Sequence, residues 1–327
     1  MSETPETRPI LQVEDLHVRF STPAGVVRAV EGVSLALAAG ETLAIVGESG
    51  CGKSTLARTI LGIETRHQGQ IRFDGREIPA GGRARRALSR ELQLIFQDPD
   101  ASLNPRLTIG QAVAEPLVIH QPKLSRGARR EAVLSLLGRV GLDPTLIDRY
   151  PHELSGGQRQ MVSIARALSL RPRVLILDEA VSALDVSIRA QILNLLVGLQ
   201  RDFGLAYLFI THDLGVVRYL SHRVAVMYLG QIVEEAETDA LFDDPRHPYT
   251  KALLGAVLRV DADAPRPSPG LSGDLPSPLH PPAGCRFHSR CREAVPHCAA
   301  HAIPLVELGT RRARCVWVDP AFGEREP

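Results

Sequence analysis

The sequence lacks a strong charge of either sign. Its 327 residues include 38 Lys and Arg against 37 Asp and Glu, which leaves a formal net charge of +1. Proteins that bind nucleic acid non-specifically carry a marked basic excess. We therefore expect no nucleic-acid partner.

Long apolar segments are also lacking. No run approaches the roughly 18 to 20 apolar residues that span a bilayer. Residues 1–10 have no basic patch followed by an apolar core, so we expect no secretion signal and a cytosolic protein. Hydrophobic residues make up 44% and charged residues 23% of the chain, as in packed domains, which excludes wholesale disorder.

Two kinds of apolar pattern predict strands. Apolar and polar residues alternate over 16–20 and 33–37, which predicts half-buried antiparallel strands. Short continuous apolar runs are typical of parallel strands covered on both faces, and they occur at 42–46, 174–177 and 207–210. Helical stripes lie between these runs, for example over 161–168 and 188–199. The alternation predicts an α/β fold with a parallel sheet.

A glycine-rich segment after the run 42–46 predicts a phosphate-binding loop. Residues 47–54 read GESGCGKS and fit the pattern G-x-x-x-x-G-K-[ST] between a strand and a helix. Glycines let backbone N–H groups surround an anion, and the helix N-terminus adds positive partial charge. The alternative is a glycine-rich turn without a ligand. The candidate residues, called here the phosphate loop, are Gly47, Glu48, Ser49, Gly50, Cys51, Gly52, Lys53, Ser54 and Thr55.

Within this loop, two side chains have specific expected roles. Lys53 would reach the β- and γ-phosphates, and Ser54 would give its hydroxyl to Mg²⁺.

An acidic pair follows the apolar run at 174–177. Asp178 ends that run, where a carboxylate can hold Mg²⁺, and Glu179 can act as general base towards an attacking water. A pair that merely caps the next helix is the alternative.

A second glycine-containing segment, LSGGQ, begins at Leu154 and opens the amphipathic helix predicted over 158–169. Its anion-binding candidates are Ser155, Gly156, Gly157 and Gln158. With two such elements about 100 residues apart, the chain resembles the ATP-binding cassette (ABC) family, in which the signature loop of one subunit closes over ATP held by another.

The resemblance implies roles for further residues. Gln97, in FQDP, would touch Mg²⁺ and water and sense a membrane partner; Asp185, in SALD, would lie at the dimer seam; His212, in THD, would contact the γ-phosphate. The implied catalytic set is Glu179, His212 and Gln97. Phe20 occupies the place of the aromatic residue that stacks on adenine, with a long loop expected at 21–28; a plain core phenylalanine is the alternative.

The resemblance also implies the architecture. The expected fold is the P-loop NTPase cassette, with a RecA-like parallel sheet core, an antiparallel β subdomain and a helical subdomain at about 98–165. We expect the ATPase domain to cover 1–259. A small Cys-containing C-terminal extension would cover 260–327.

Longer stretches resemble one branch of the family, the oligopeptide/dipeptide importer ATPases. They include FQDPDASLNPR, SALDVSIRAQI, VMYLGQIVE and HPYTKALL, and they are more similar to the second, F-type ATPase of a heterodimeric pair. His247, Pro248 and Tyr249 mark the C-terminal extension of that branch. Importers of nickel or other small solutes use similar ATPases and remain an alternative, as does a non-transport ABC ATPase acting on ribosomes or DNA.

The branch implies partners and a location. These are ATP and Mg²⁺, a second ATPase subunit in a homo- or heterodimer, two transmembrane permease subunits, and a periplasmic or lipid-anchored solute-binding protein. The chain would sit peripherally on the cytoplasmic face of the inner membrane.

Four of the five cysteines gather in the C-terminal extension: Cys285, Cys291, Cys298 and Cys315. In a reducing cytosol, clustered cysteines suggest a metal site, and four thiolates suit Zn²⁺ or a [4Fe–4S] cluster. Their spacing matches neither the usual zinc pattern nor the ferredoxin pattern. The branch resemblance implies an iron–sulfur cluster in some members, and zinc or plain thiols stay open.

Overall fold

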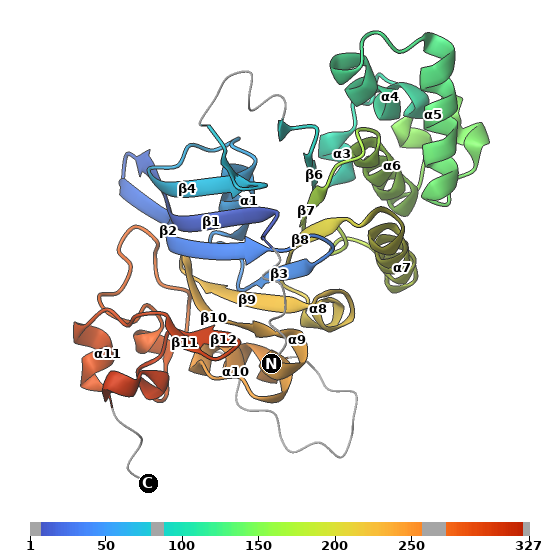
Figure 1. Cartoon of the computed structure of the whole chain (residues 1–327). Coiled ribbons are helices and arrows are strands. Elements are labelled where there is room, and N and C mark those ends of the chain that lie inside the picture. The colour runs from blue at the N-terminus through green and yellow to red at the C-terminus, as the bar shows by residue number, and fades with distance from the viewer. Residues whose placement is uncertain (1–7, 80–87, 257–272, 323–327) are drawn as a thin grey trace, which may run out of the picture. The chain divides into compact units, whose positions relative to one another are not determined.

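The continuous apolar runs form strands that are buried along their whole length, as predicted. They are β3 (Thr42–Val46), β7 (Val174–Asp178) and β8 (Ala206–Thr211). The structure is a computed structural model that describes residues 8–79, 88–256 and 273–322 (Figure 1). The chain divides into two units, one of Met1–Ile10, Leu37–Glu41 and Ile78–Ile210 and the other of the remaining residues.

The first unit contains a parallel sheet with the strand order β8, β7, β6 (Leu92–Ile95). Val174 of β7 lies opposite both Ala206 of β8 and Leu92 of β6. Between β7 and β8 runs α7 (Val186–Phe203), which ends at Gly204 in the left-handed conformation (φ +63°). This strand–helix–strand connection is the expected way to join parallel neighbours.

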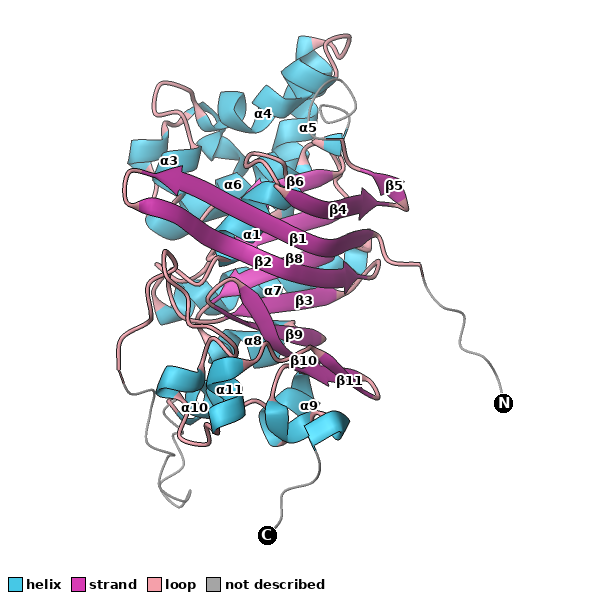
Figure 2. Cartoon of the chain, turned by 90° about the vertical axis from the view of Figure 1, so that its left-hand side faces the viewer, coloured by secondary structure: helices cyan, strands magenta, loops and turns pink. Residues whose placement is uncertain are grey.

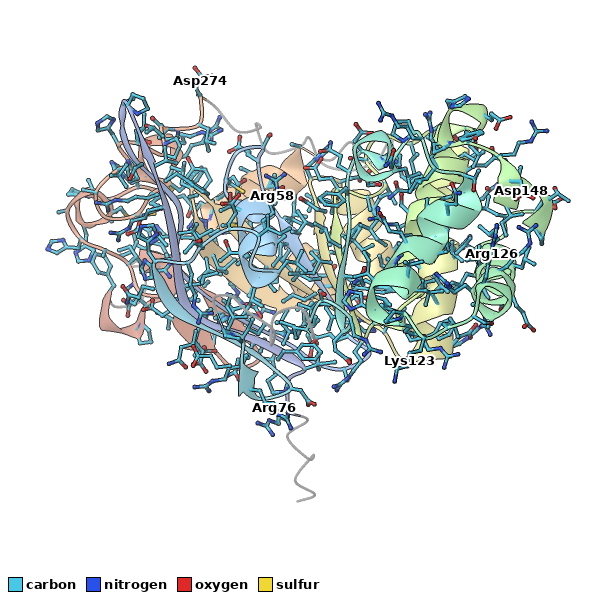
Figure 3. The ribbon with its side chains drawn as sticks, turned by 90° about the horizontal axis from the view of Figure 1, so that it is seen from above. Arg58, Arg76, Lys123, Arg126, Asp148 and Asp274 are labelled. Atoms are coloured by element: carbon cyan, nitrogen blue, oxygen red, sulfur yellow. The ribbon has the colours of Figure 1, made fainter. Side chains whose placement is uncertain are left out.

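Helices make up the rest of the first unit. In the described residues from 98 to 165, every regular element is helical, and the elements are α3 (Pro99–Ser102), α4 (Ile109–His120), α5 (Arg126–Arg139), α6 (Gly156–Leu168) and the short 3₁₀ turns Pro144–Asp148 and Pro151–Glu153. Arg126 and Asp148, labelled in Figure 3, are exposed side chains of this region. Asp148 forms an ion pair with Arg130 of α5 at 3.2 Å, which ties the 3₁₀ turn to the helix.

The second unit contains a mixed sheet and an antiparallel sheet (Figure 2). The mixed sheet has the order β11 (Val306–Leu308), β12 (Arg311–Ala313), β10 (Gln231–Glu237), β9 (Arg223–Tyr228), β3, in which only β3 and β9 are parallel. The other sheet has the order β2 (Gly25–Leu37), β1 (Leu11–Thr22), β4 (Gln68–Phe73), β5 (Arg76–Glu77). The half-buried strands predicted near the N-terminus are confirmed.

The helices of the second unit are short. They are α1 (Lys53–Ile60), α8 (Leu214–Leu220), α9 (Thr238–Asp243), α10 (Pro248–Gly255), α11 (Pro296–Ala300) and the 3₁₀ turns η3 (His288–Arg290), Val316–Val318 and Pro320–Phe322. Nowhere in the described part of either unit is a helix both long enough and apolar enough to cross a bilayer.

The long loop expected at 21–28 is wrong. Strand β1 continues to Thr22 and β2 begins at Gly25, so Pro23 and Ala24 alone form the turn. The Thr22 hydroxyl donates to the Gly25 carbonyl at 2.8 Å, and Gly25 has φ +131°. Residues 21–26 are exposed, so this end of the hairpin carries none of the apolar alternation from which a strand is predicted.

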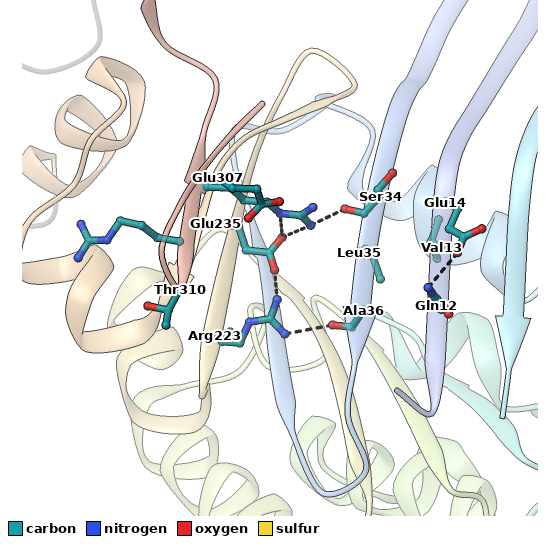
Figure 4. Close-up of a pocket in the computed structure, with 12 residues that line it drawn as sticks. Gln12, Val13, Glu14, Ser34, Leu35, Ala36, Arg223, Glu235, Glu307 and Thr310 are labelled. Atoms are coloured by element: carbon teal, nitrogen blue, oxygen red, sulfur yellow. Dashed lines mark hydrogen bonds and ion pairs between the residues drawn. The ribbon is translucent and has the colours of Figure 1, made fainter. Parts of the chain in front are cut away.

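A buried carboxylate joins the C-terminal extension to the rest of the second unit. Glu235 of β10 is 2% exposed and is held by two arginines, Arg223 of β9 and Arg312 of β12. Each arginine also donates to a carbonyl of β2, Arg312 to Ser34 at 2.7 Å and Arg223 to Ala36 at 3.2 Å. These residues line a pocket of about 320 Å³ (Figure 4).

We predict that Glu235→Ala destabilises the chain because it leaves two guanidinium groups without their shared carboxylate. Breaking a buried ion pair costs about 3 kcal/mol, at the low end of the usual range because Arg223 is partly exposed. Urea denaturation of the full chain measures the change. The control Glu307→Ala removes an exposed carboxylate that lines the same pocket and should change stability by less than about 0.5 kcal/mol. Equal effects of the two substitutions would contradict the assignment.

Candidate functional site

The phosphate loop lies between β3 and α1 in the second unit, as its motif predicts. Two of its glycines are required by close backbone approaches. A Cβ atom at Gly47 would lie 2.1 Å from the carbonyl oxygen of Met227, and one at Gly52 would lie 2.2 Å from that of Ala29. Both glycines have positive φ, +154° and +108°, which other residues rarely adopt. No other residue type fits either position without moving the backbone.

Lys53 is folded over the phosphate loop. Its side chain is nearly buried, with 5% of the residue exposed, and its Nζ donates to the carbonyls of Gly47 at 2.8 Å and Glu48 at 2.9 Å. The ammonium group is therefore held at the mouth of the loop by neutral acceptors, which an anionic phosphate oxygen can replace with a stronger partner.

The first turn of α1 completes this anion-binding arrangement. Its N-cap is Gly52, which has no side chain to cap the N–H groups of that turn. A helix N-terminus without a side-chain cap, a buried ammonium and a glycine backbone together fit a phosphate chain. Ser54, the expected Mg²⁺ ligand, is the second residue of α1 and is half-buried.

The acidic pair lies in the first unit at the carboxyl end of β7. Asp178 is the last residue of the strand and is 6% exposed. Glu179 has φ +52°, a left-handed conformation that is uncommon for a residue with a side chain. The Ser182 hydroxyl donates to the Glu179 carbonyl at 2.8 Å and lies 3.4 Å from its Oε2, and the Glu179 N–H donates to Ile210 at 2.9 Å. The structure therefore holds Glu179 in a strained and closely defined position, as functional residues often are.

The signature segment also lies in the first unit and begins α6. The Ser155 hydroxyl accepts from the Gln158 N–H at 3.3 Å, and the Gln158 amide oxygen accepts from the Ser155 N–H at 2.9 Å. This reciprocal pair is a capping box, so the helix begins at Gly156, two residues before the predicted start. A Cβ atom at Gly157 would lie 2.4 Å from Cγ2 of Ile188, whereas Gly156 has open space around it.

The remaining site residues lie just after strands or before helices. Gln97 is exposed two residues after β6 in the first unit. In the same unit Asp185 caps α7, and the bond from the Ile188 N–H is the main cause of the lowered pKa of its carboxyl group. His212 is exposed immediately after β8, in the second unit. Phe20 is half-buried near the end of β1, also in the second unit.

Each unit thus brings together part of the predicted site. The second unit contains the phosphate loop, His212 and Phe20. The first unit contains the acidic pair, the signature segment, Gln97 and Asp185.

Two residues that contact the phosphate loop were missed by the sequence analysis. The Tyr249 hydroxyl accepts from the Glu48 N–H at 3.0 Å, and Arg290 forms an ion pair with the Glu48 carboxylate. His247 accepts from the Tyr249 N–H at 3.0 Å and is neutral, because burial lowers its pKa to about 3. The His-Pro-Tyr segment had marked a branch of the family, but no pattern within the sequence related it, or Arg290, to the loop.

The four cysteines of the C-terminal extension are free thiols that lie close enough to influence one another. The pKa of Cys315 is raised to about 12 and that of Cys291 to about 11, mainly by burial, with a smaller contribution from the negative charge of neighbouring thiolates. The Cys285 N–H donates to the Cys298 carbonyl at 2.8 Å. Across residues 8–79, 88–256 and 273–322, no group of three or more His, Cys, Asp or Glu side chains is arranged to hold a single metal ion. The described thiols therefore do not form a ready zinc site.

Comparison with known proteins supports the family that the sequence motifs predict. Residues 30–182 match the family described as ABC transporter, and residues 233–298 match the oligopeptide/dipeptide transporter C-terminal region. The oligopeptide transport ATP-binding protein OppF of Salmonella typhimurium is 50% identical over 325 residues, 95% of this chain and 97% of its own length. The dipeptide transport ATP-binding protein DppF of Escherichia coli is 47% identical over 95% of each chain.

A solved structure supports the fold as well. An ATP-binding cassette determined as a dimer in a post-hydrolysis state, with ADP and Pi, is similar with a TM-score of 0.64 and 27% identity, over 70% of this chain and 98% of its own. These matches confirm the fold and the family that the motifs predict. The chain belongs to the ABC transporter family, among the ATP-binding proteins of its oligopeptide and dipeptide transport branch.

Proposed function

We propose that this chain binds and hydrolyses ATP as a subunit of an importer of oligopeptides or dipeptides. The observation that carries the proposal is the phosphate loop, with its required glycines, its buried Lys53 and its uncapped helix. The transported class follows from relatives that are about half identical over nearly their whole length and are named for oligopeptide and dipeptide transport. An importer of nickel or another small solute is the alternative.

For nucleotide binding, the phosphate loop surrounds the phosphates and Lys53 exchanges its carbonyl acceptors for the β- and γ-phosphates. Ser54, Gln97 and Asp178 are the residues that would hold Mg²⁺, which when bound would supply positive charge to the phosphates. The buried position of Asp178 at the end of β7 supports its role as a ligand. Phe20 stacks on the adenine ring, which suits an aromatic ring that is only half-buried.

For hydrolysis, Glu179 accepts a proton from the attacking water. Its conformation supports this role, because a fixed carboxylate needs no reorganisation in the transition state. His212 and Gln97 complete the catalytic set, with His212 at the γ-phosphate. We place the signature segment and Asp185 opposite the nucleotide held by another cassette, so that two chains enclose two ATP molecules.

The partners follow from this arrangement and from the branch. They are a second ATPase subunit, two transmembrane permease subunits and a periplasmic or lipid-anchored solute-binding protein, with this chain on the cytoplasmic face of the membrane. The similar cassette solved as a dimer supports the first of these. Copurification with a membrane-embedded permease, and not with ribosomes, distinguishes transport from the non-transport alternative.

We assign 1–259 to the ATPase domain and 260–327 to the C-terminal extension.

We further propose that the four thiols of the C-terminal extension hold a [4Fe–4S] cluster. Their mutual proximity supports this, and a cluster of four irons holds its thiolates further apart than a single ion does, so the lack of a single-ion site in the described residues is compatible with it. Cys285, Cys291, Cys298 and Cys315 would be the ligands, and the bound cluster would cross-link this small region at four points.

The first prediction concerns Glu179. Replacing it by glutamine keeps its size and removes its proton-accepting charge, so turnover should fall by ~10²- to 10⁴-fold while ATP binding is retained. ATPase assays and equilibrium binding on the same protein give both quantities. Glu131→Gln, an exposed change on α5, serves as the control and should leave both unchanged. Unaltered hydrolysis in Glu179→Gln would remove Glu179 from the mechanism.

Two substitutions at Ser155 separate the helix-capping role of the signature segment from its proposed role in nucleotide binding. Asp and Asn both cap helices as well as Ser does, so either should preserve α6. Ser155→Asp adds a negative charge facing the partner's triphosphate and should lower ATP-dependent dimerisation and hydrolysis by at least about tenfold more than the neutral Ser155→Asn does. Size-exclusion chromatography in the Glu179→Gln background, with the second cassette present, measures dimerisation. Equal behaviour of the two variants would argue against this placement.

The third prediction concerns the cysteines. Full-length protein purified without oxygen should be coloured and contain about four irons per chain. Cys291→Ser should lose iron and colour, whereas Cys51→Ser, which changes the one cysteine outside the C-terminal extension, should retain both. A colourless, iron-free preparation rejects the cluster.

A further inference from the structure

The strongest contact between the C-terminal extension and the phosphate loop is an ion pair with two hydrogen bonds. Arg290 ends η3, one residue before Cys291. Its two terminal nitrogens donate to the two carboxylate oxygens of Glu48, at 2.6 and 3.0 Å. The Arg290 side chain is 5% exposed and that of Glu48 is 26% exposed. A paired, nearly buried guanidinium is far more costly to disturb than a surface ion pair.

Aromatic side chains fix the position of Arg290. Its guanidinium carbon lies 5.8 Å from the ring centre of Tyr228, whose hydroxyl also accepts from it at 3.4 Å. Phe287, from the same segment, packs edge-on against Tyr228 at 5.3 Å and against Tyr249 at the same distance. The hydrogen bond to Glu48 raises the pKa of Arg290, so the group is cationic at every relevant pH.

Glu48, in turn, is held at three points. Its N–H donates to the Tyr249 hydroxyl at 3.0 Å, its carbonyl accepts from Lys53 at 2.9 Å, and its carboxylate accepts from Arg290. Glu48 is the second residue of the phosphate loop. Its carboxylate is therefore a fixed negative charge in a loop that we expect to receive a polyanion.

We propose that Arg290 is a positioning residue for ATP binding: it neutralises Glu48 and holds the phosphate loop in shape, so that the affinity of the cassette for ATP depends on the C-terminal extension of the same chain. The inference rests on the proposed function in one respect, that the loop binds ATP. Without Arg290, the carboxylate of Glu48 is unpaired and repels the phosphates, and one of the three contacts on that residue is lost.

A double-mutant cycle on the full chain tests this proposal. Arg290→Gln should raise the dissociation constant for ATP and the KM for ATP about tenfold, with kcat at saturating ATP unchanged. Glu48→Gln alone should lose less ATP affinity than Arg290→Gln, because the amide oxygen can still accept from Arg290 and carries no negative charge. In the double variant the affinity should return to within about threefold of the parent, because the unpaired charge is gone. Isothermal titration calorimetry measures ATP binding and steady-state assays give KM and kcat.

Two further variants sharpen the test. Arg292→Ala removes a neighbouring exposed arginine and should leave ATP affinity unchanged. Arg290→Lys keeps the charge but loses the planar fork, so its loss of affinity should be smaller than that of Arg290→Gln.

The possible results separate the two hypotheses. An Arg290→Gln protein that binds ATP as the parent does overturns the inference alone. An equal loss of affinity in the presence and absence of Glu48→Gln would show that Arg290 acts only through folding, and it overturns the inference as well. This comparison between backgrounds holds even where Arg290→Gln lowers the melting temperature. Failure of the parent chain to bind ATP overturns the proposed function instead.

Discussion

The close approach of the phosphate loop to two backbone carbonyls is the constraint on which the nucleotide site depends. Met227 belongs to β9 and Ala29 to β2, and their carbonyl oxygens leave no room for a Cβ atom at Gly47 or Gly52. The loop is thus shaped by the strands behind it as much as by its own sequence. The glycines of the motif therefore meet a packing requirement, the close approach of neighbouring backbone, in addition to the phosphate binding proposed for the loop.

Local features of the fold and site were predictable because their causes are local. The buried strand β3 and the helix that follows the loop depend on residues within a few positions of one another. Helix α6 was expected on the same grounds, but its start was predicted two residues late, because the Ser155–Gln158 capping box begins it at Gly156. The conformation of Glu179 was not predictable in this way. Its positive φ is maintained by bonds from its own N–H to Ile210, on the neighbouring strand, and from Ser182. The motif names the acid but does not indicate the strain.

Pairing between distant segments accounts for most of what the sequence could not reveal. Arg290 and Glu48 are 242 residues apart, and no periodicity relates them. A different cause applies at the exposed end of the β1–β2 hairpin, where backbone pairing between neighbouring strands continues past Phe20 although the apolar alternation ends there. A strand held by its neighbour's hydrogen bonds needs no apolar face, and only such a face is visible in one sequence.

Although the net charge of the chain is close to zero, specific ion pairs hold the C-terminal extension to the preceding chain. Three arginines of the C-terminal extension each meet a carboxylate of the preceding chain: Arg286 meets Glu31 at 2.9 Å, Arg290 meets Glu48 at 2.6 Å and Arg312 meets Glu235 at 2.6 Å. Arginine suits these contacts because its planar guanidinium has five N–H donors. It can donate twice to a carboxylate and still donate to a second acceptor. Since β12 also pairs with β10, the extension is bonded both to the sheet and to the phosphate loop. Because Cys291 directly follows Arg290, the cysteine-containing region is bonded to the phosphate loop through the Arg290–Glu48 ion pair.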